Sequence, residues 1–224
     1  MPDPSPATNA PIVWDATGNR RYELGVDHGV LYVCNSDGSY GKGVAWNGLV
    51  SVTSTPDGAE AQDLYADNMK YGSLRSTETY GGNISCYTTP DEFAVCNGEV
   101  EITKGVTAGQ QGRRKFGFSY RTKQGDDTES DPTQYLIHLV YGATASPSEA
   151  EYDAINDSPD AITFSYDFDT SPVSWVGHKP VSHIVVYSRK VEAVKLQKLE
   201  STLYGSSTAA PKLPLPSELA AILA

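Results

Sequence analysis

Apolar and polar residues alternate strictly in one segment of the second half of the chain. Ile162, Phe164, Tyr166 and Phe168 are apolar, and the residues between them are polar. Successive side chains of a strand point to opposite faces, so this segment predicts a strand with one buried and one solvated face. The run 135–141 is instead apolar on both faces, which predicts a strand that is covered on both sides.

Other short apolar or alternating segments predict further strands. Segment 115–122 alternates through Phe116, Phe118 and Tyr120. Asn47-Gly48 is a candidate tight turn between two predicted strands, or a bulge through which the chain continues. The remaining predicted strands are 29–34, 44–46, 49–53, 83–87, 100–104 and 181–187.

Helical signals are fewer. Segment 190–204 places Leu196, Leu199 and Leu203 on one stripe and is followed by Gly205, a typical helix stop. Thr89 and Ser146 each precede a proline and, three residues later, a glutamate, which is the pattern of a capped helix start. We therefore expect short helices from residue 90 to a stop at Gly98 and from 147 to about 155.

Residues 54–82 are polar and irregular, with Tyr65, Met69 and Tyr71 as scattered apolar anchors. So long a loop is uncommon in a compact domain and is usually functional, although two poorly patterned strands are an alternative. Strands dominate throughout, so the fold class is α+β, mainly β, and a sandwich with one main helix. We expect an extended, proline-rich N-terminal arm over 1–20, a sandwich domain over 21–205 and a C-terminal arm over 206–224.

Composition narrows the functional classes. The 224-residue chain has a formal net charge of −11, which disfavours nucleic-acid binding through basic clusters. Arg113-Arg114-Lys115 is the one such cluster, and it leads into a strand, where a solvated entry or an ion-pair partner is the simpler interpretation. Three cysteines, without a Cys-x-x-Cys pair, predict reduced and mostly buried thiols. No stretch is apolar enough to span a membrane, and no secretory signal is evident, which predicts synthesis in the cytoplasm.

The residues that could form a functional motif do not have the spacing that the motif requires. The glycines of 38–43 lack the spacing of a phosphate-binding loop, and the acidic connection 126–131 lacks the calcium-loop pattern. His138 lies within an apolar strand, so a hydrogen-bonded core histidine is a better interpretation than a ligand. The sequence therefore predicts no catalytic residue, no cofactor and no metal; whether 126–131 binds a cation stays open.

Both ends of the chain carry apolar residues on segments with little core of their own. Burying each one could contribute ~1.5–3 kcal/mol, and together they approach the stability of an ordinary domain. Such residues are suited to docking on neighbouring copies, although disordered ends are the alternative. With the two anchors of 54–82, the predicted inter-subunit contacts are Ile12, Trp14, Tyr65, Met69, Leu219, Ile222 and Leu223.

Ten blocks follow one another in a fixed order: 23–32, 43–49, 58–61, 64–68, 91–94, 105–111, 116–121, 141–147, 156–159 and 177–180. Together they resemble the major tail proteins, or tail tube proteins, of long-tailed, non-contractile bacteriophages (siphoviruses) of Gram-positive bacteria. The resemblance runs from about residue 22 to 216. Ser119, where the family often has cysteine, and Gly125-Asp126, often Gly-Asn, depart from the pattern.

The resemblance implies a structural virion protein without catalytic residues. It implies hexameric rings of β-sandwiches that stack into a tube around a tape measure protein and join tail-end proteins. Double-stranded DNA would pass through this tube without specific binding, and no membrane would be involved. The alternative from a different class is a carbohydrate-binding β-sandwich or adhesin domain, because the chain has 14 tyrosines.

Overall fold

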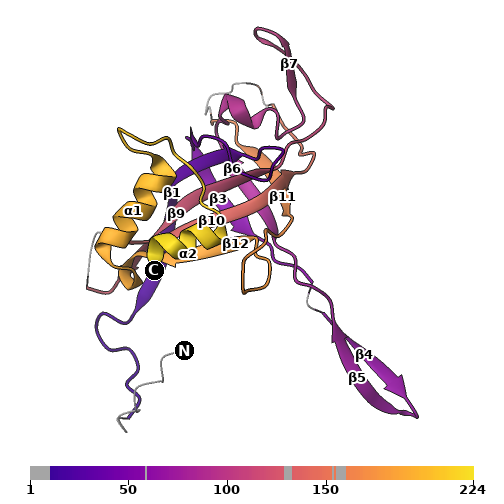
Figure 1. Cartoon of the computed structure of the whole chain (residues 1–224), viewed down its shortest axis with the longest axis vertical. Coiled ribbons are helices and arrows are strands. Elements are labelled where there is room, and N and C mark those ends of the chain that lie inside the picture. Colours follow the sequence, from indigo (N-terminus) through magenta and orange to yellow (C-terminus); the bar gives the residue numbers. More distant parts are fainter. Residues whose placement is uncertain (1–10, 59, 129–132, 153, 155–159) are drawn as a thin grey trace.

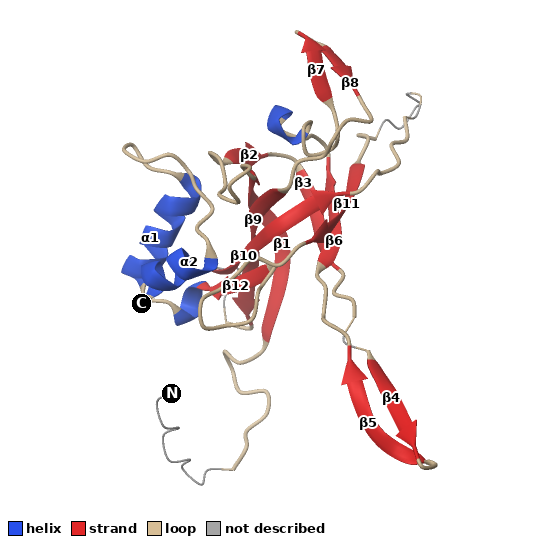
Figure 2. Ribbon diagram, turned by 45° about the vertical axis from the view of Figure 1, so that its right-hand side comes forward, coloured by secondary structure: helices blue, strands red, loops and turns tan. Residues whose placement is uncertain are grey.

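The computed structural model describes residues 11–58, 60–128, 133–152, 154 and 160–224. It is mainly β, as predicted, with two α-helices and two 3-10 turns in the described part (Figures 1 and 2). The helical elements are η1 (Asp91–Phe93), η2 (Ser188–Lys190), α1 (Ala193–Tyr204) and α2 (Pro216–Leu223). The strands are β1 (Arg21–Val33), β2 (Val44–Trp46), β3 (Leu49–Ser54), β4 (Ala61–Ala66), β5 (Met69–Arg75), β6 (Gly81–Cys86), β7 (Val100–Thr103), β8 (Val106–Ala108), β9 (Phe116–Asp126), β10 (Gln134–Ala145), β11 (Phe164–Thr170) and β12 (His183–Tyr187).

The main sheet folds over on itself at β10. Its order is β2-β1-β9-β10-β11-β6-β3, and β12 pairs with the first half of β10. The register of β10 against β9 shifts between Val140 and Ala143, and β10 pairs with β11 only from Ala143 onward. Gly142 has a φ of 61°, and a Cβ there would lie 2.2 Å from the carbonyl oxygen of Ser171. Only glycine fits this crossing, which lets one strand serve both layers of the sandwich.

One core fills the space between the two layers. Phe93, from η1, packs its ring 4.7 Å from Trp46 and 5.6 Å from Phe116, measured between centroids. Phe116, Phe118 and Phe168 are buried in the same cluster. The predicted short helix near residue 90 is thus a single 3-10 turn, and its role is to place Phe93 in the core.

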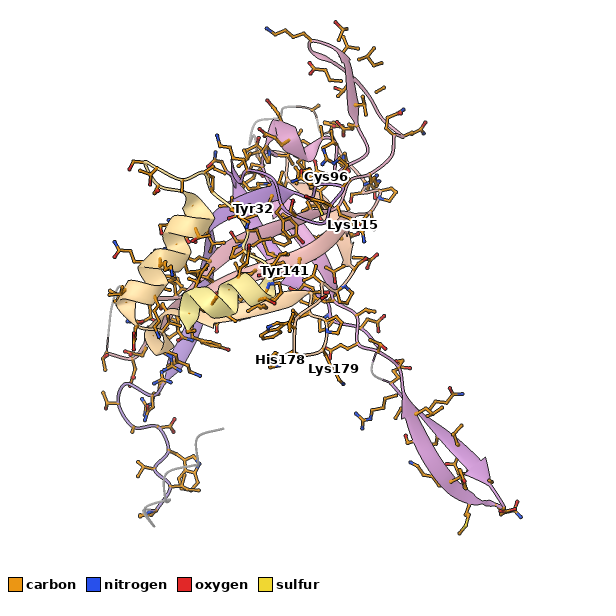
Figure 3. All side chains as sticks on the ribbon, in the orientation of Figure 1. Tyr32, Cys96, Lys115, Tyr141, His178 and Lys179 are labelled. Atoms are coloured by element: carbon orange, nitrogen blue, oxygen red, sulfur yellow. The ribbon has the colours of Figure 1, made fainter. Side chains whose placement is uncertain are left out.

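A second core lies between the outer face of the sheet and the two α-helices. Tyr32 and Tyr141, labelled in Figure 3, are fully buried there with Leu199 and Leu203 of α1. The Tyr32 hydroxyl donates to the carbonyl of Leu203 at 2.8 Å, and the Tyr141 hydroxyl donates to that of Pro214 at 3.0 Å. The structure therefore confirms that the apolar run 135–141 is covered on both faces.

Two helix predictions need correction. The main helix begins at Ala193, because Ser188–Lys190 form a separate 3-10 turn, and it ends before Gly205, whose φ is 85°. Residues 146–152 form no helix, and 153 and 155–159 lie outside the described residues. Ser148 accepts a hydrogen bond from the amide of Asp167 at 3.2 Å, so this capping residue ties the loop to β11 instead of starting a helix.

The turn at Asn47-Gly48 does not join a hairpin. Gly48 has a φ of 74°, as a tight turn requires, but β2 pairs with β1 and β3 pairs with β6. The turn carries the chain from one layer of the sandwich to the other.

The C-terminal segment is not an extended arm. Residues 216–223 form α2, which packs on α1 and on the outer face of the sheet. Leu213 and Leu219 are buried in this second core, and Ile222 and Leu223 pack against it. The apolar residues of this end therefore find their burial within the same chain.

We accordingly expect Leu219→Ala to lower the free energy of unfolding by about 2–4 kcal/mol, because it leaves a cavity in the second core. Ala221→Ser, on the exposed face of α2, should change it by less than about 0.5 kcal/mol. Urea unfolding of dilute protein measures both values. A Leu219→Ala variant as stable as the parent would contradict the assignment of α2 to the core.

Candidate assembly interface

The β4–β5 hairpin projects from the body of the molecule (Figures 1 and 2). Every residue of β4 is exposed, and so is every residue of β5 except Gly72. The tip is Asp67-Asn68, with φ values of 51° and 60°, which is the two-residue turn that matches the twist of a hairpin. An ion pair between Lys70 Nζ and Asp63 Oδ1, 2.7 Å apart, links the two strands. The alternative of two poorly patterned strands within 54–82 is therefore confirmed.

Large apolar side chains cover this hairpin without a core beneath them. Tyr65 is 72% exposed and Met69 is 66% exposed, directly beside the turn. Leu64, Tyr71 and Leu74 are also exposed along the two strands. A two-stranded ribbon is at best marginally stable alone, and clustered exposed apolar residues mark interaction sites. The structure thus brings the two predicted contact residues of this segment together at one tip.

A second, shorter hairpin projects at the opposite end of the molecule in both views (Figures 1 and 2). It consists of β7 and β8, joined through Gly105, whose φ is 79° and whose amide donates to the Glu101 carboxylate at 2.9 Å. Val100, Ile102 and Val106 are exposed on it. Sequence reasoning predicted β7 but missed β8, a strand of three residues.

The N-terminal arm also leaves the body without packing on it (Figure 1). Residues 11–20 form no strand or helix, and 1–10 lie outside the described residues. Ile12, Val13 and Trp14 are 73%, 72% and 77% exposed. At the root of the arm, Gly18 donates its amide to Asp127 Oδ1 at 2.7 Å, so part of the acidic connection 126–131 holds the arm in place. Residues 129–131 of that connection lie outside the described residues.

The root of the β4–β5 hairpin lies against a stack of four rings. Tyr120 stacks on His138, His138 on His183, and His183 on Tyr80, with centroid distances of 4.5, 5.5 and 4.7 Å. His138 Nδ1 lies 3.3 Å from His183 Nε2, and its Nε2 lies 3.0 Å from the Thr122 hydroxyl. The core interpretation of His138 is thus supported.

This stack disfavours protonation. Burial, and to a smaller extent the charge of His183, lowers the pKa of His138 to about 4. Burial also lowers the pKa of His183. Tyr80 exchanges a hydrogen bond with the Ser54 hydroxyl at 2.8 Å, which joins the stack to both connectors of the hairpin.

The remaining chemical candidates have structural partners. Arg113 donates to the carbonyl of Ala145 at 2.9 Å, Arg114 to that of Cys34 at 2.7 Å, and Lys115 to the Ser171 hydroxyl at 3.0 Å (Figure 3 labels Lys115). The three basic side chains therefore hold neighbouring chain segments in place through these hydrogen bonds. Cys86 and Cys96 are buried, and Cys34 is partly exposed. Within the described ranges, no group of three or more His, Cys, Asp or Glu side chains could hold a metal ion, and no helix is long and apolar enough to cross a bilayer.

Exposed tyrosines, on which the carbohydrate-binding alternative depends, are spread over separate elements. Tyr65 and Tyr71 lie on the β4–β5 hairpin, Tyr87 follows β6, and Tyr152 packs its ring 6.1 Å from Phe164. The predicted inter-subunit contact residues fall into two groups. The hairpin and arm residues are exposed, whereas Leu219, Ile222 and Leu223 pack within the chain.

Comparison with known proteins identifies the family of the chain. A family model described as phage tail tube protein matches residues 32–206. No curated protein matches the chain. The match covers the sandwich except for β1, of which it includes only the last two residues, and it includes both projecting hairpins.

Proposed function

Because the chain belongs to the phage tail tube protein family, we propose that it assembles into stacked, hexameric rings that deliver DNA to the host. Membership of the family makes it a structural component of the virion tail, not an enzyme, and implies self-assembly into a tube. The finer architecture follows the resemblance to siphovirus major tail proteins, with a tape measure protein inside the tube and tail-end proteins at its ends.

The projection of two different apolar hairpins from opposite ends of the molecule carries this proposal. Unlike surfaces at opposite ends favour head-to-tail contacts, and head-to-tail contacts propagate when they do not close into a ring. In this arrangement, the β4–β5 hairpin of one copy packs with Tyr65 and Met69 on a copy in the adjacent ring. Ile12 and Trp14 extend the contact between copies, while Leu219, Ile222 and Leu223 stabilise the subunit that carries them.

The negative net charge of the chain is compatible with the passage of DNA through the tube. A ring of six copies has a formal charge of −66, six times the −11 of one chain. Duplex DNA is itself strongly anionic, so acidic side chains on the lumen wall would prevent adhesion. Screening limits this repulsion to about 8 Å at physiological salt, and the wall then acts only on DNA that comes close.

Self-assembly gives the direct test. We expect purified protein, concentrated stepwise, to form regular tubes in negative-stain electron microscopy and to sediment as large particles. Tyr65→Ser in the same series should shift tube formation to higher concentration, since it removes an exposed anchor. A chain that remains a monomer at millimolar concentration would contradict the proposal, and a monomer that binds glycans would favour the carbohydrate-binding alternative.

A further inference from the structure

A groove with apolar walls lies between β12, α2 and the loop that precedes β12. Its volume is about 280 Å³. The lining includes Trp175 from the loop, Ile184 and Val186 from β12, and Leu219 and Leu223 from α2. This size is below that of most small-molecule sites, and it suits a few side chains of a peptide segment.

One wall of the groove is the edge of a sheet. Within the described residues, β12 pairs only with β10, so its other edge has no strand partner. Free edges of this kind can pair with an added extended segment, which gains main-chain hydrogen bonds while its alternate side chains enter pockets. The groove therefore favours an extended, apolar peptide.

The same chain contains such a peptide. Residues 11–14 lie outside any helix or strand, and Ile12, Val13 and Trp14 are largely exposed. Asp15 follows them directly, and its ion pair with Arg20, 3.8 Å from Oδ1 to Nε, is largely exposed and therefore weak. At the groove, the exposed Lys190 has its Nζ over the Tyr187 ring at 4.7 Å and has no carboxylate partner among the described side chains. A cation at the groove thus complements the anion beside the apolar segment.

Geometry disfavours insertion of the arm into its own groove. The strand order β1-β9-β10-β12 separates the two by three strand spacings, roughly 14 Å. Arg21 pairs with Asp126, and the rows of Tyr187 and Ile184 lie four and seven residues farther along β9, which adds about 13–23 Å along the strands. Seven residues join Trp14 to Arg21 and span at most about 25 Å. The tether would have to be nearly fully stretched and to fold back over the sheet, whereas a neighbouring copy removes this constraint.

We propose that the groove between β12 and α2 receives the Ile12–Trp14 segment of a second copy of this chain. The inference rests on the proposed function, since self-assembly supplies that copy. It assigns the acceptor surface for the N-terminal arm: Trp14 and Ile12 enter the groove, the backbone of the arm lies along β12, and Asp15 pairs with Lys190.

Cysteine crosslinking between full-length chains tests this assignment. Ile12→Cys chains are mixed with Ala220→Cys chains that carry a longer tag, because Ile12 is placed in the groove and Ala220 is an exposed residue of the groove. After assembly and mild oxidation, a non-reducing gel should show a mixed dimer, several-fold more abundant than with Val194→Cys chains. Val194 is 78% exposed on α1, outside the groove, and chains without an added cysteine control for Cys34.

Each of the other possible outcomes of the crosslinking experiment contradicts a specific part of the proposal. Normal tubes without selective crosslinking would overturn the groove assignment and leave the tube function intact. A bridge within single chains of an Ile12→Cys/Ala220→Cys double variant, without dimers, would show that the arm fills its own groove. Absence of both tubes and crosslinks would overturn the proposed function together with this inference.

Discussion

Replacing the β4–β5 hairpin with a short turn should give a folded protein that no longer forms tubes. The root of the hairpin closes on itself, because the amides of Asp57 and Thr79 donate to each other's carbonyls at 2.9 and 2.8 Å. A turn can therefore replace residues 58–78 and still connect β3 to β6. The hairpin contributes no buried side chain to either core, so the free energy of unfolding should change little.

Point substitutions give the size of the effect without removing backbone. Burial of Tyr65 and Met69 on a neighbour would contribute about 1.5–3 kcal/mol each. The double variant Tyr65→Ser/Met69→Ser should then raise the concentration needed for assembly at least about 100-fold, since each 1.4 kcal/mol is a factor of ten. Val194→Ser is the matched control, with a similar exposed fraction on α1. Sedimentation across a concentration series measures the threshold, and an unchanged threshold would contradict a role of the hairpin in stacking.

Acid should destabilise the subunit through the ring stack at the hairpin root. The pKa of His138 is near 6.5 in an unfolded chain and about 4 in the folded one. Between these values the unfolded chain binds more protons, so the free energy of unfolding falls as the pH falls from about 6.5 to 4. Above pH 6.5 this effect is absent, and below pH 4 it no longer changes. The loss is roughly 2–3 kcal/mol as an upper bound, because His138 is not fully buried.

The variant His138→Phe isolates this contribution. Phenylalanine keeps a ring between Tyr120 and His183 but cannot be protonated. Its stability should therefore depend less on pH between 6.5 and 4 than that of the parent, although loss of the contact with Thr122 lowers the value at pH 7. Urea unfolding at several pH values measures both slopes. Equal slopes would show that His138 does not carry the acid sensitivity.

Sequence patterns predicted the sandwich well where strands have a buried face. The alternating residues of β11 and the doubly apolar β10 gave clear signals because burial imposes them. The β4–β5 hairpin has no buried face, so no alternation marks it. The turn at Asp67-Asn68 was the available signal, since Asp and Asn tolerate positive φ, but it lacks the glycine of the usual hairpin pair.

Capping motifs misled in one place for a physical reason. Ser146 and Ser148 have the residue types of a helix start, but their polar groups bond to β11 and to each other. A local pattern cannot report a competing partner that is about twenty residues away. Tertiary contacts decide such cases.

For the candidate assembly interface, too, the sequence does not show which tertiary contacts a residue makes. Apolar residues at both ends of the chain signal a need for burial, and the sequence does not say on which surface. For Leu219 the surface is the sheet of its own chain, whereas Trp14 is exposed in the subunit. Tyr65 and Met69 were selected as candidates because bulky apolar side chains within a polar segment stand out regardless of the secondary structure, and both are exposed in the subunit.

In the proposed head-to-tail tube, the opposed placement of the two hairpins makes the filament polar. At one terminus the longer β4–β5 ribbon extends beyond the last subunit, and at the other only the shorter β7–β8 ribbon does. The molecule that starts such a filament and the one that stops it must therefore present different complementary surfaces, and neither can substitute for the other.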